Sequence, residues 1–451
     1  MVETRSTATV RPLPGPRVGV ILAAGESQRL RSVTGGGSKA LVGLGGLRLV
    51  ERAIRTLLDL GLESVMVVVG FRGGPVAAVA QRVAPGRVKI VEAPDWREGN
   101  GASLAAAESA VAGEASFLLV SADHVFSEAA LAGLVGSREP AVLVDPQPDP
   151  VVIEEATKVA LDADGGVKEL GKGLRAPVAE CGAMLLPASI FPSVARSRKE
   201  GDGSLSAAVT ALARQERVSA VPLSAKAWWQ DVDTPADLSR AGRLLRRSLP
   251  RDTDGPVSRL LNRRISVPVS WLLSRFRPSP DALSVISMIV GLAGAILLGR
   301  GEGVWGGVLV QLCSILDGVD GEVARLTLRA GPRGTLWDGF LDRLGDAAIC
   351  AGLGIWATGE GGDARLVLGL VVAATAGAML SMATKDRVAA LGLEPPSERR
   401  IGWLLGGRDG RLFLVFVLAL LGEPILALAV TAATSLFSSA IRVGFARNPP
   451  P

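Results

Sequence analysis

The chain has 451 residues, a mildly basic net charge of +5 and 48% apolar residues, which is enough for two or three domains. Its three cysteines show neither metal-ligand spacing nor a plausible disulfide framework, so we interpret them as reduced residues of a core or a membrane segment. Residues 1–16 are charged and proline-rich and contain no apolar run, which excludes a secretory signal peptide and predicts a disordered N-terminus. We expect no nucleic-acid partner.

Apolar residues are unevenly distributed along the chain. Residues 17–245 alternate short apolar runs with helical segments, as soluble α/β proteins do, whereas residues 277–446 are dominated by long apolar runs. Residues 246–276 form a basic linker that continues into an amphipathic segment, which we expect to lie at a membrane interface. The sequence therefore predicts a Rossmann-like α/β domain followed by an all-α domain of six transmembrane helices.

The first apolar run, Val18–Ala23, is rich in β-branched residues and leads directly into a glycine-bearing loop, residues 24–29. A strand that feeds a tight loop and then a helix directs backbone N–H groups at phosphates. Arg29 in the loop and Lys39 beyond it could neutralise a triphosphate and the pyrophosphate that it releases. The loop alone is weak evidence, because many Rossmann-type folds contain one.

The pattern Leu-Ala-Ala-Gly-x-Ser-x-Arg, followed by a lysine before a leucine, resembles the nucleotidyltransferase superfamily that activates sugar phosphates. That superfamily usually has Pro-Lys where this chain has Ser38-Lys39. The resemblance implies that Lys39 and Arg29 are catalytic cations. It also implies nucleotide-binding roles for Leu22, Ala23, Ala24, Gly25, Lys39, Gly101 and Ser103.

Three further apolar runs, at 64–70, 88–92 and 116–121, are predicted to be buried strands. The last of them is followed by Asp123 and His124, and an acidic residue at the carboxyl end of a parallel strand faces the ligand crevice. In the nucleotidyltransferase superfamily this aspartate holds Mg²⁺, which implies the same role for Asp123. His124 could be a general base or could hydrogen-bond a neighbouring group, and we favour the second role.

A second acidic element, Asp231 to Pro235, also resembles that superfamily, so that Asp231 or Asp233 would complete a site for at least one Mg²⁺. The same residues suit a helix start, with Asp233 or Thr234 as N-cap, and both interpretations can hold at once. Lys158 and Glu180 resemble elements that bind the acceptor phosphate and the polyol hydroxyls, although single charges of this kind are more often surface residues.

In the second half, six apolar segments are each about long enough to span a lipid bilayer as a helix, except that the fifth is short and would need residues from its flanks. They are residues 282–298, 304–325, 336–358, 366–384, 411–421 and 424–441. The connectors after the second and fourth segments are rich in arginine, whereas the loops around 301 and 361 carry little positive charge. The positive-inside rule therefore predicts a multi-pass protein of the cell membrane with both termini and both candidate sites on the cytoplasmic side.

Four aspartates lie at helical spacing in the second and third of these segments: Asp317, Asp320, Asp338 and Asp342. Residues three or four apart share one face of a helix, and four converging carboxylates repel each other strongly without cations. Mg²⁺ suits such oxygen ligands and could bridge a substrate diphosphate. A solvated acidic loop is the alternative, but the long apolar runs on both sides argue against it.

These residues satisfy every fixed position of Asp-x2-Asp-Gly-x2-Ala-Arg-x8-Gly-x3-Asp-x3-Asp, and so resemble the CDP-alcohol phosphotransferase family. Its members are integral membrane enzymes that use an acceptor hydroxyl to displace CMP from a CDP-linked donor. The resemblance implies that the aspartates hold two metal ions and that Asp342 also acts as the general base. It places Asp317, Gly321, Ala324 and Arg325 at the nucleotide. Arg408 and Arg411 could hold an acceptor phosphate or could serve only as topological charges.

The two halves together suggest that the first makes the donor that the second consumes. Their order resembles a family of bifunctional enzymes that make CDP-inositol from CTP and inositol 1-phosphate. These enzymes then transfer the inositol phosphate moiety to a second inositol 1-phosphate with release of CMP, giving di-myo-inositol phosphate phosphate, a precursor of a compatible solute. The membrane family is commonly dimeric, which implies a homodimer.

Two alternatives remain open. One is a membrane phospholipid synthase whose soluble half activates another polyol or sugar phosphate. The other is a membrane-tethered nucleotide-binding regulator, and the intact aspartate quartet argues against it.

Overall fold

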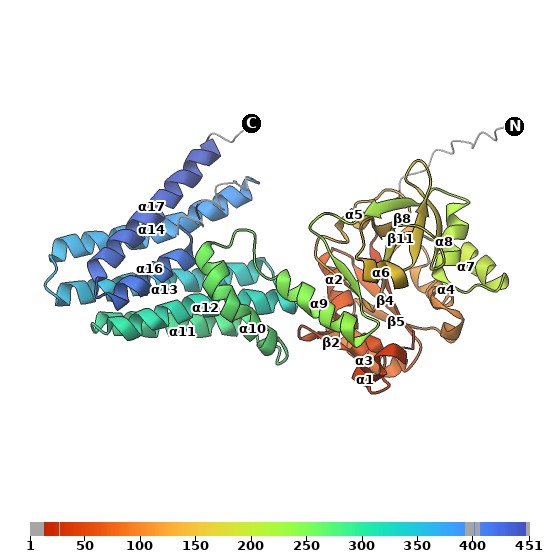
Figure 1. The fold of residues 1–451 in the computed structure, drawn as a ribbon, viewed down its shortest axis with the longest axis horizontal. Coiled ribbons are helices and arrows are strands. Elements are labelled where there is room, and N and C mark those ends of the chain that lie inside the picture. The colour runs from red at the N-terminus through yellow and green to blue at the C-terminus, as the bar shows by residue number, and fades with distance from the viewer. Residues whose placement is uncertain (1–12, 27, 393–400, 402–405, 448–451) are drawn as a thin grey trace. The chain divides into compact units, whose positions relative to one another are not determined.

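The computed structural model describes residues 13–26, 28–392, 401 and 406–447. The chain divides into two compact units, residues 1–245 and 246–451, which are described separately (Figure 1). The expected disordered N-terminus lies, for residues 1–12, outside the described residues. The backbone N–H of Leu13 donates to the carbonyl of Arg138 at 2.7 Å.

The first unit is built on a nine-stranded sheet with the strand order β10-β9-β11-β6-β1-β4-β5, and β8 and β12 continue from β11. Strands β1, β4, β5 and β6 run parallel, whereas β11 runs antiparallel to β6. The four parallel strands lie where the apolar runs predict them. The sheet comprises β1 (Val18–Ala23), β4 (Ser64–Val69), β5 (Val88–Glu92), β6 (Ser116–Ser121), β8 (Ala141–Asp145), β9 (Lys158–Leu161), β10 (Val167–Gly171), β11 (Ala179–Pro187) and β12 (Ser219–Pro222).

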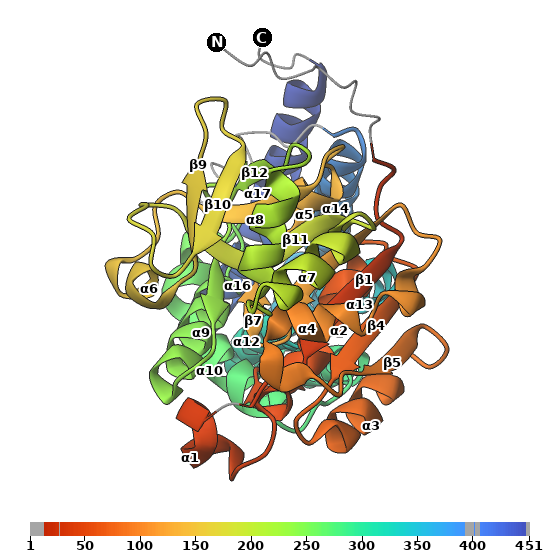
Figure 2. The ribbon, with the colours of Figure 1, turned by 90° about the vertical axis from the view of Figure 1, so that its right-hand side faces the viewer.

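Helices cover both faces of this sheet, which is why its central strands are apolar on both sides. Val20 of β1 belongs to the core beneath α4, α7 and α8, whereas the adjacent Ile21 belongs to the core beneath α2 and α3 (Figure 2). These helices are α2 (Leu49–Asp59), α3 (Gly73–Val83), α4 (Asn100–Ala105), α7 (Ile190–Lys199) and α8 (Leu205–Ala213). The architecture is the Rossmann-like α/β fold that the sequence predicts.

Two small antiparallel ribbons accompany the sheet. Strand β7 (His124–Phe126) pairs with β13 (Trp229–Asp231), and β2 (Gly43–Leu44) pairs with β3 (Leu47–Arg48). Helix α9 (Pro235–Arg247) follows β13, and Thr234 is its N-cap, because its Oγ1 accepts from the N–H of Asp237 at 3.2 Å. The remaining short helices are α1 (Arg31–Thr34), α5 (Ala132–Val135) and α6 (Pro150–Glu155).

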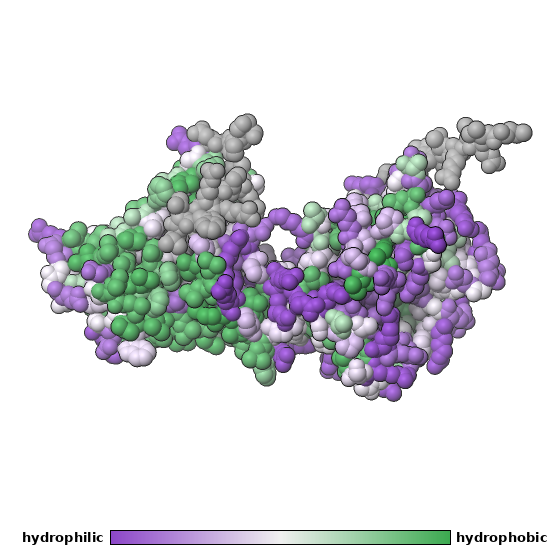
Figure 3. All heavy atoms as spheres, in the orientation of Figure 1, coloured by the Kyte–Doolittle hydropathy of each residue, from purple (hydrophilic) through white to green (hydrophobic). Residues whose placement is uncertain are grey.

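The second unit is helical, and each of the predicted apolar segments lies largely within one of its helices. A π-helical turn, Ser258–Asn262, leads into α10 (Arg263–Ser274). The following helices are α11 (Pro280–Gly299), α12 (Gly303–Leu326), α13 (Pro332–Gly359), α14 (Ala364–Ala390), α16 (Arg408–Leu420) and α17 (Pro424–Arg447). Within the described residues, α11, α14 and α17 are long and apolar enough to cross a membrane. On the face drawn in Figure 3 this unit presents a broad apolar surface, unlike the mainly hydrophilic α/β unit.

Small residues allow α11, α12 and α13 to approach one another closely. A Cβ atom on Gly352 of α13 would lie 2.2 Å from the carbonyl oxygen of Ala295 in α11, so only glycine fits there. A Cβ atom on Gly306 of α12 would lie 2.7 Å from Cγ and 2.8 Å from the backbone nitrogen of Leu298 in α11. Such close packing is common between membrane helices, and here it fixes α12 and α13, which carry the aspartate quartet, around α11.

Candidate active sites

The first acidic cluster lies at the carboxyl ends of β6 and β13. The ammonium group of Lys39 forms ion pairs with Asp123 and Asp233, and the guanidinium of Arg29 pairs with Asp233 and Glu155. The structure thus brings together both predicted catalytic cations and the predicted acidic elements. Asp233 pairs with these two cations, whereas Thr234 is the N-cap of α9.

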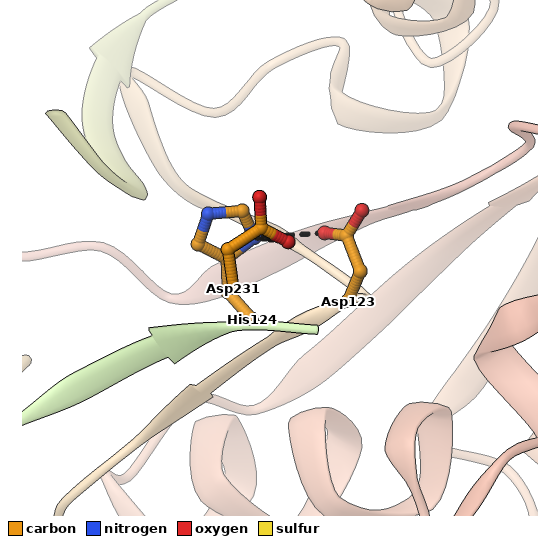
Figure 4. Close-up of side chains that lie close together, drawn as sticks. All are labelled: Asp123, His124 and Asp231. Carbon is orange, nitrogen blue, oxygen red and sulfur yellow. Dashed lines mark hydrogen bonds and ion pairs between the residues drawn. The ribbon is translucent and has the colours of Figure 1, made fainter. Parts of the chain in front are cut away.

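Asp123, His124 and Asp231 converge on one point (Figure 4). One ligand atom from each lies within 4.8 Å of the others, and His124 Nδ1 is 2.8 Å from Asp123 Oδ1 and 3.9 Å from Asp231 Oδ1. Asp231 Oδ1 is buried and has no hydrogen-bond partner among the described residues. A buried carboxylate oxygen without a partner is costly, and a hard divalent cation would satisfy it. The residues therefore fit a divalent metal ion.

The electrostatics of this cluster follow from burial and mutual attraction. Burial raises the pKa of Asp231 to about 6 and that of Glu180 to about 7, although His124 opposes both shifts. Burial lowers the pKa of His124, but Asp231 and Asp123 outweigh burial and raise it to about 9. Burial also opposes the charge of Asp123, yet Lys39 and His124 hold its pKa well below its usual value.

The predicted nucleotide-binding residues lie on two elements of this unit. Leu22, Ala23 and Ala24 are buried at the end of β1, and Gly25 follows them in an exposed position. Gly101 and Ser103 lie in the first turns of α4, where a Cβ on Gly101 would come within 2.7 Å of the carbonyl oxygen of Gly203. Gly101 thus has a packing role, and its contact with a nucleotide stays a prediction.

The two residues predicted to meet the sugar phosphate lie on neighbouring strands. Lys158 begins β9 opposite Ala179, the residue before Glu180 in β11. Its ammonium group donates to the carbonyl of Lys172 at 3.0 Å. Glu180 Oε1 accepts from the N–H of Gly182 at 2.5 Å. Glu180 and Asp231 both interact electrostatically with His124, whereas the described contacts of Lys158 lie elsewhere.

In the helical unit, the four aspartates of α12 and α13 all line one cavity of about 230 Å³. One carboxylate oxygen from each of Asp317, Asp338 and Asp342 lies within 4.8 Å of the others. Asp320 is oriented separately, because its two oxygens accept from the hydroxyl of Ser284 and from the N–H of Gly321. Closely spaced carboxylate oxygens in a shared cavity are the donor set that hard divalent cations prefer, so this site also fits metal ions.

Arg408, at the start of α16, lies within this carboxylate cluster. Its Nη1 is 2.9 Å from Asp317 and 3.0 Å from Asp342, and its Nε is 3.0 Å from Asp346. Arg411 is one turn further along α16, is buried, and has its Nη2 3.7 Å from Asp346. Both arginines line the cavity, and their contact with an acceptor phosphate stays a prediction.

Three residues of this cavity were not singled out from the sequence. Asp346 continues the stripe of carboxylates on α13 by one turn beyond Asp342, and this spacing was the available signal. Arg442 of α17 is buried and donates to the carbonyl of Ser381 at 2.7 Å, and Lys385 lines the cavity beside it. An ionisable residue within an apolar span, such as Arg442, is itself an indication of function.

The remaining signature residues differ in whether they reach the cavity. Gly321 and Arg325 line the cavity, and Ala324 is buried. Arg325 Nη2 donates to the carbonyl of Leu249 at 3.0 Å and so ties the linker to α12. Contact of these residues with a nucleotide stays a prediction.

A buried carboxylate at a variable position of the signature connects α10 to α12. Glu322 is fully buried and accepts hydrogen bonds from Arg263 at 2.7 Å, Ser266 at 2.7 Å and Ser270 at 2.6 Å. Arg263 also bonds both oxygens of Asp254, at 2.8 and 3.1 Å. These contacts anchor the linker and α10 beside the aspartate cavity.

In a comparison with known proteins, each unit matches a different protein family. Residues 19–218 match the family described as MobA-like NTP transferase domain, and residues 278–439 match CDP-alcohol phosphatidyltransferase. A protein of Rubrobacter xylanophilus named bifunctional IPC transferase and DIPP synthase is 39% identical over 424 residues, which cover 92% of each chain. The chain belongs to this family.

Other relatives agree with the assignment. A protein of Aquifex aeolicus with the same name is 31% identical over 89% of this chain and 92% of its own length. A stretch of 131 residues is similar to the phosphatidylinositol phosphate synthase of Streptomyces avermitilis, with 33% identity over 29% of this chain and 53% of that protein. The chain therefore combines a nucleotidyltransferase domain with a CDP-alcohol phosphotransferase domain. This second domain and three candidate spans indicate membrane association.

Proposed function

We propose that the α/β unit makes CDP-inositol and pyrophosphate from CTP and inositol 1-phosphate. The helical unit then transfers the inositol phosphate moiety to a second inositol 1-phosphate, releasing CMP and giving di-myo-inositol phosphate phosphate. One observation carries this proposal: a chain of this family has a convergent carboxylate cluster in each of its two transferase domains.

In the first reaction, a phosphate oxygen of inositol 1-phosphate attacks the α-phosphorus of CTP, and the bond from that phosphorus to the pyrophosphate breaks. The nucleophile is already an anion, so no proton has to be removed from it. Lys39 and Arg29 both contact Asp233, which brings their positive charges to the place where charge develops on the pyrophosphate. Glu180 is positioned to accept hydrogen bonds from the polyol.

In the second reaction, a hydroxyl of inositol 1-phosphate attacks the β-phosphorus of CDP-inositol, and the bond to CMP breaks. Asp342 takes the proton of that hydroxyl. Asp342 suits this role because one of its carboxylate oxygens belongs to the cluster, and the residue lines the cavity. Asp317 and Asp338 supply the other oxygens of the cluster, and Asp320 lines the same cavity.

Metal ions complete both sites in this proposal. We assign two Mg²⁺ ions to Asp317, Asp320, Asp338 and Asp342, and at least one to Asp123 with Asp231 or Asp233. When bound, Mg²⁺ neutralises charge on the phosphoryl oxygens and on the leaving group. The unpartnered, buried oxygen of Asp231 supports the assignment of Mg²⁺ to the α/β unit. The clustered carboxylate oxygens of α12 and α13 support the assignment of Mg²⁺ to the helical unit.

The phosphate of the acceptor has a suitable place in the helical unit. Arg411, Arg442 and Lys385 line the same cavity as the aspartates, and Arg411 and Arg442 both approach Ser381. Arginine forks match phosphate oxygens, so this basic side of the cavity would hold the phosphate while the hydroxyl faces Asp342. Arg408 lies between the two sides.

We further propose that the domains are residues 17–245 and 277–446, joined by the linker 246–276. The six described helices α11, α12, α13, α14, α16 and α17 would all cross the cell membrane, with both termini and both sites on the cytoplasmic side. A homodimer is the proposed assembly.

A second candidate function is phospholipid synthesis, which the similarity of a 131-residue stretch to a phosphatidylinositol phosphate synthase favours. The acceptor or donor would then carry acyl chains. The test is to incubate the purified full chain with CTP, Mg²⁺ and labelled inositol 1-phosphate and to identify the products by mass. We expect water-soluble CDP-inositol, pyrophosphate, CMP and the phosphorylated di-inositol ester. A product that forms only with added lipid and partitions into organic solvent would favour the second function.

A further inference from the structure

We propose that His124 is a positioning residue of the cytidylyl-transfer site. Its Nδ1–H donates to Asp123 Oδ1 and fixes the orientation in which the Asp123 carboxylate meets a divalent cation. This inference rests on the proposed function of the α/β unit.

The contacts of Asp123 support a positional role for its neighbour. Asp123 Oδ1 is 2.8 Å from His124 Nδ1, while Asp123 Oδ2 pairs with the ammonium of Lys39. The two oxygens are thus held by different groups, which restricts rotation of the carboxylate about its last bond. His124 Nδ1 also faces Asp231 Oδ1 at 3.9 Å, so one ring nitrogen lies between the carboxylates of the two acidic elements (Figure 4).

The imidazole ring is itself held on several sides. His124 lies opposite Asp231 in the β7–β13 ribbon, and its ring stacks on Trp229 at 5.7 Å between centroids with an interplanar angle of 3°. Trp229 is anchored in turn by a hydrogen bond from its Nε1 to Asp145 at 3.0 Å. On another side lies Gly182, whose φ is +79° and whose Cβ, if present, would be 2.3 Å from His124 Cδ2. A ring confined in this way can set the direction of a hydrogen bond.

Two other roles for His124 fit the geometry less well. A general base has no proton to take, because the nucleophile of the first reaction is a phosphate anion. Gly182 also covers the face of the ring, since a Cβ there would lie 2.3 Å from Cδ2, 2.5 Å from Cγ and 2.6 Å from Nε2. As a direct metal ligand, an imidazole would favour softer ions than Mg²⁺, whereas Asp123 and Asp231 already offer oxygens.

Two substitutions separate the roles, because they retain different parts of the ring. In His124→Asn the side-chain amide can donate from near the position of Nδ1, whereas in His124→Gln it reaches toward the position of Nε2. We expect His124→Gln to raise the Mg²⁺ concentration for half-maximal pyrophosphate release by about 10- to 100-fold, the range for residues that orient a metal ligand. His124→Asn should stay within about 3-fold of the original chain, on the same reasoning. CMP release from supplied CDP-inositol should be unchanged in both variants, which reports that the helical unit is folded and active.

A measurement without turnover tests the hydrogen bond itself. The chain contains one histidine, so ¹⁵N-histidine labelling of the full chain in lipid gives one pair of imidazole nitrogen signals. We expect a protonated Nδ1 whose shift changes in Asp123→Asn. An unprotonated Nδ1, or a chemical shift that does not change in Asp123→Asn, would overturn the proposal. An equal rise in the required Mg²⁺ concentration in His124→Asn and His124→Gln would also overturn it. A changed preference between Mg²⁺ and Co²⁺ in both variants would instead identify His124 as a ligand. If the original chain released no pyrophosphate, the proposed function would fail, and the nitrogen shifts would still decide the hydrogen bond.

Discussion

Lys39 is the cation on which the first reaction depends most in this account. Its ammonium contacts Asp123 and Asp233, which hold it at the carboxyl ends of β6 and β13. We expect Lys39→Met to lower pyrophosphate release by about 10²- to 10³-fold, the usual loss for a group that stabilises developing charge. CMP release from supplied CDP-inositol should persist. The exposed Lys168 provides the control, because Lys168→Met should change neither rate.

Arg411 tests the proposed phosphate side of the membrane cavity. It is buried, lies 3.7 Å from Asp346 and lines the cavity with Arg442. We expect Arg411→Ala to raise the KM for the acceptor inositol 1-phosphate by about 10- to 100-fold, because a charge-assisted hydrogen bond contributes about 1.5–3 kcal/mol. The KM for CDP-inositol should change much less. Arg329, which is exposed, serves as the matched arginine control. An equal rise in both KM values would contradict the proposed contact between Arg411 and the acceptor phosphate.

At the scale of residues, the sequence predicted what local spacing determines. The quartet Asp317, Asp320, Asp338 and Asp342 was predictable because helical periodicity sets which side chains share a face. The contacts of Arg408 with Asp317 and Asp342, however, join residues more than sixty positions apart, and no local pattern encodes them. The buried, unpartnered oxygen of Asp231 is likewise a product of tertiary packing.

At the scale of elements, the docking of α10 on α12 depends on Glu322. Removing its carboxylate leaves Arg263 and two serine hydroxyls buried without their acceptor. We expect Glu322→Ala to destabilise the helical unit by about 3–5 kcal/mol, as breaking a buried ion pair does, and Ser270→Ala by about 1 kcal/mol. The measurement is the temperature at which the heated chain loses CMP release. Equal midpoints for Glu322→Ala and the original chain would contradict this role.

The helices themselves were largely predictable, because long apolar runs that meet lipid can satisfy their backbone hydrogen bonds only within a helix. Helix α10 shows where this logic ends. Its buried face consists of Ser266, Ser270 and Ser274, which an analysis of apolar periodicity assigns to the polar side. These serines are buried because Glu322 offers the first two a polar partner, and that pairing is visible only in the structure.

At the scale of the whole molecule, the central expectation is that both reactions occur on one side of the membrane. Glu302 precedes α12 and the exposed Arg329 follows it, so the two positions should face opposite compartments if α12 crosses the bilayer. In intact cells, a membrane-impermeant maleimide should label Glu302→Cys and should label Arg329→Cys only after permeabilisation. The native cysteines are buried and give a low background. Labelling of both positions from outside would refute the topology.

Joining the two transferases in one chain keeps the intermediate at high local concentration for the second site. The division of labour between the two carboxylate clusters is the claim on which the rest of the account depends. It assigns proton removal to Asp342 and assigns nothing in the first reaction to that residue.

The most direct test uses the purified full chain carrying Asp342→Asn, supplied with CTP, Mg²⁺ and inositol 1-phosphate. We expect pyrophosphate release at the rate of the original chain, accumulation of CDP-inositol identified by mass, and no CMP. Equal loss of pyrophosphate release and of CMP release would contradict the account.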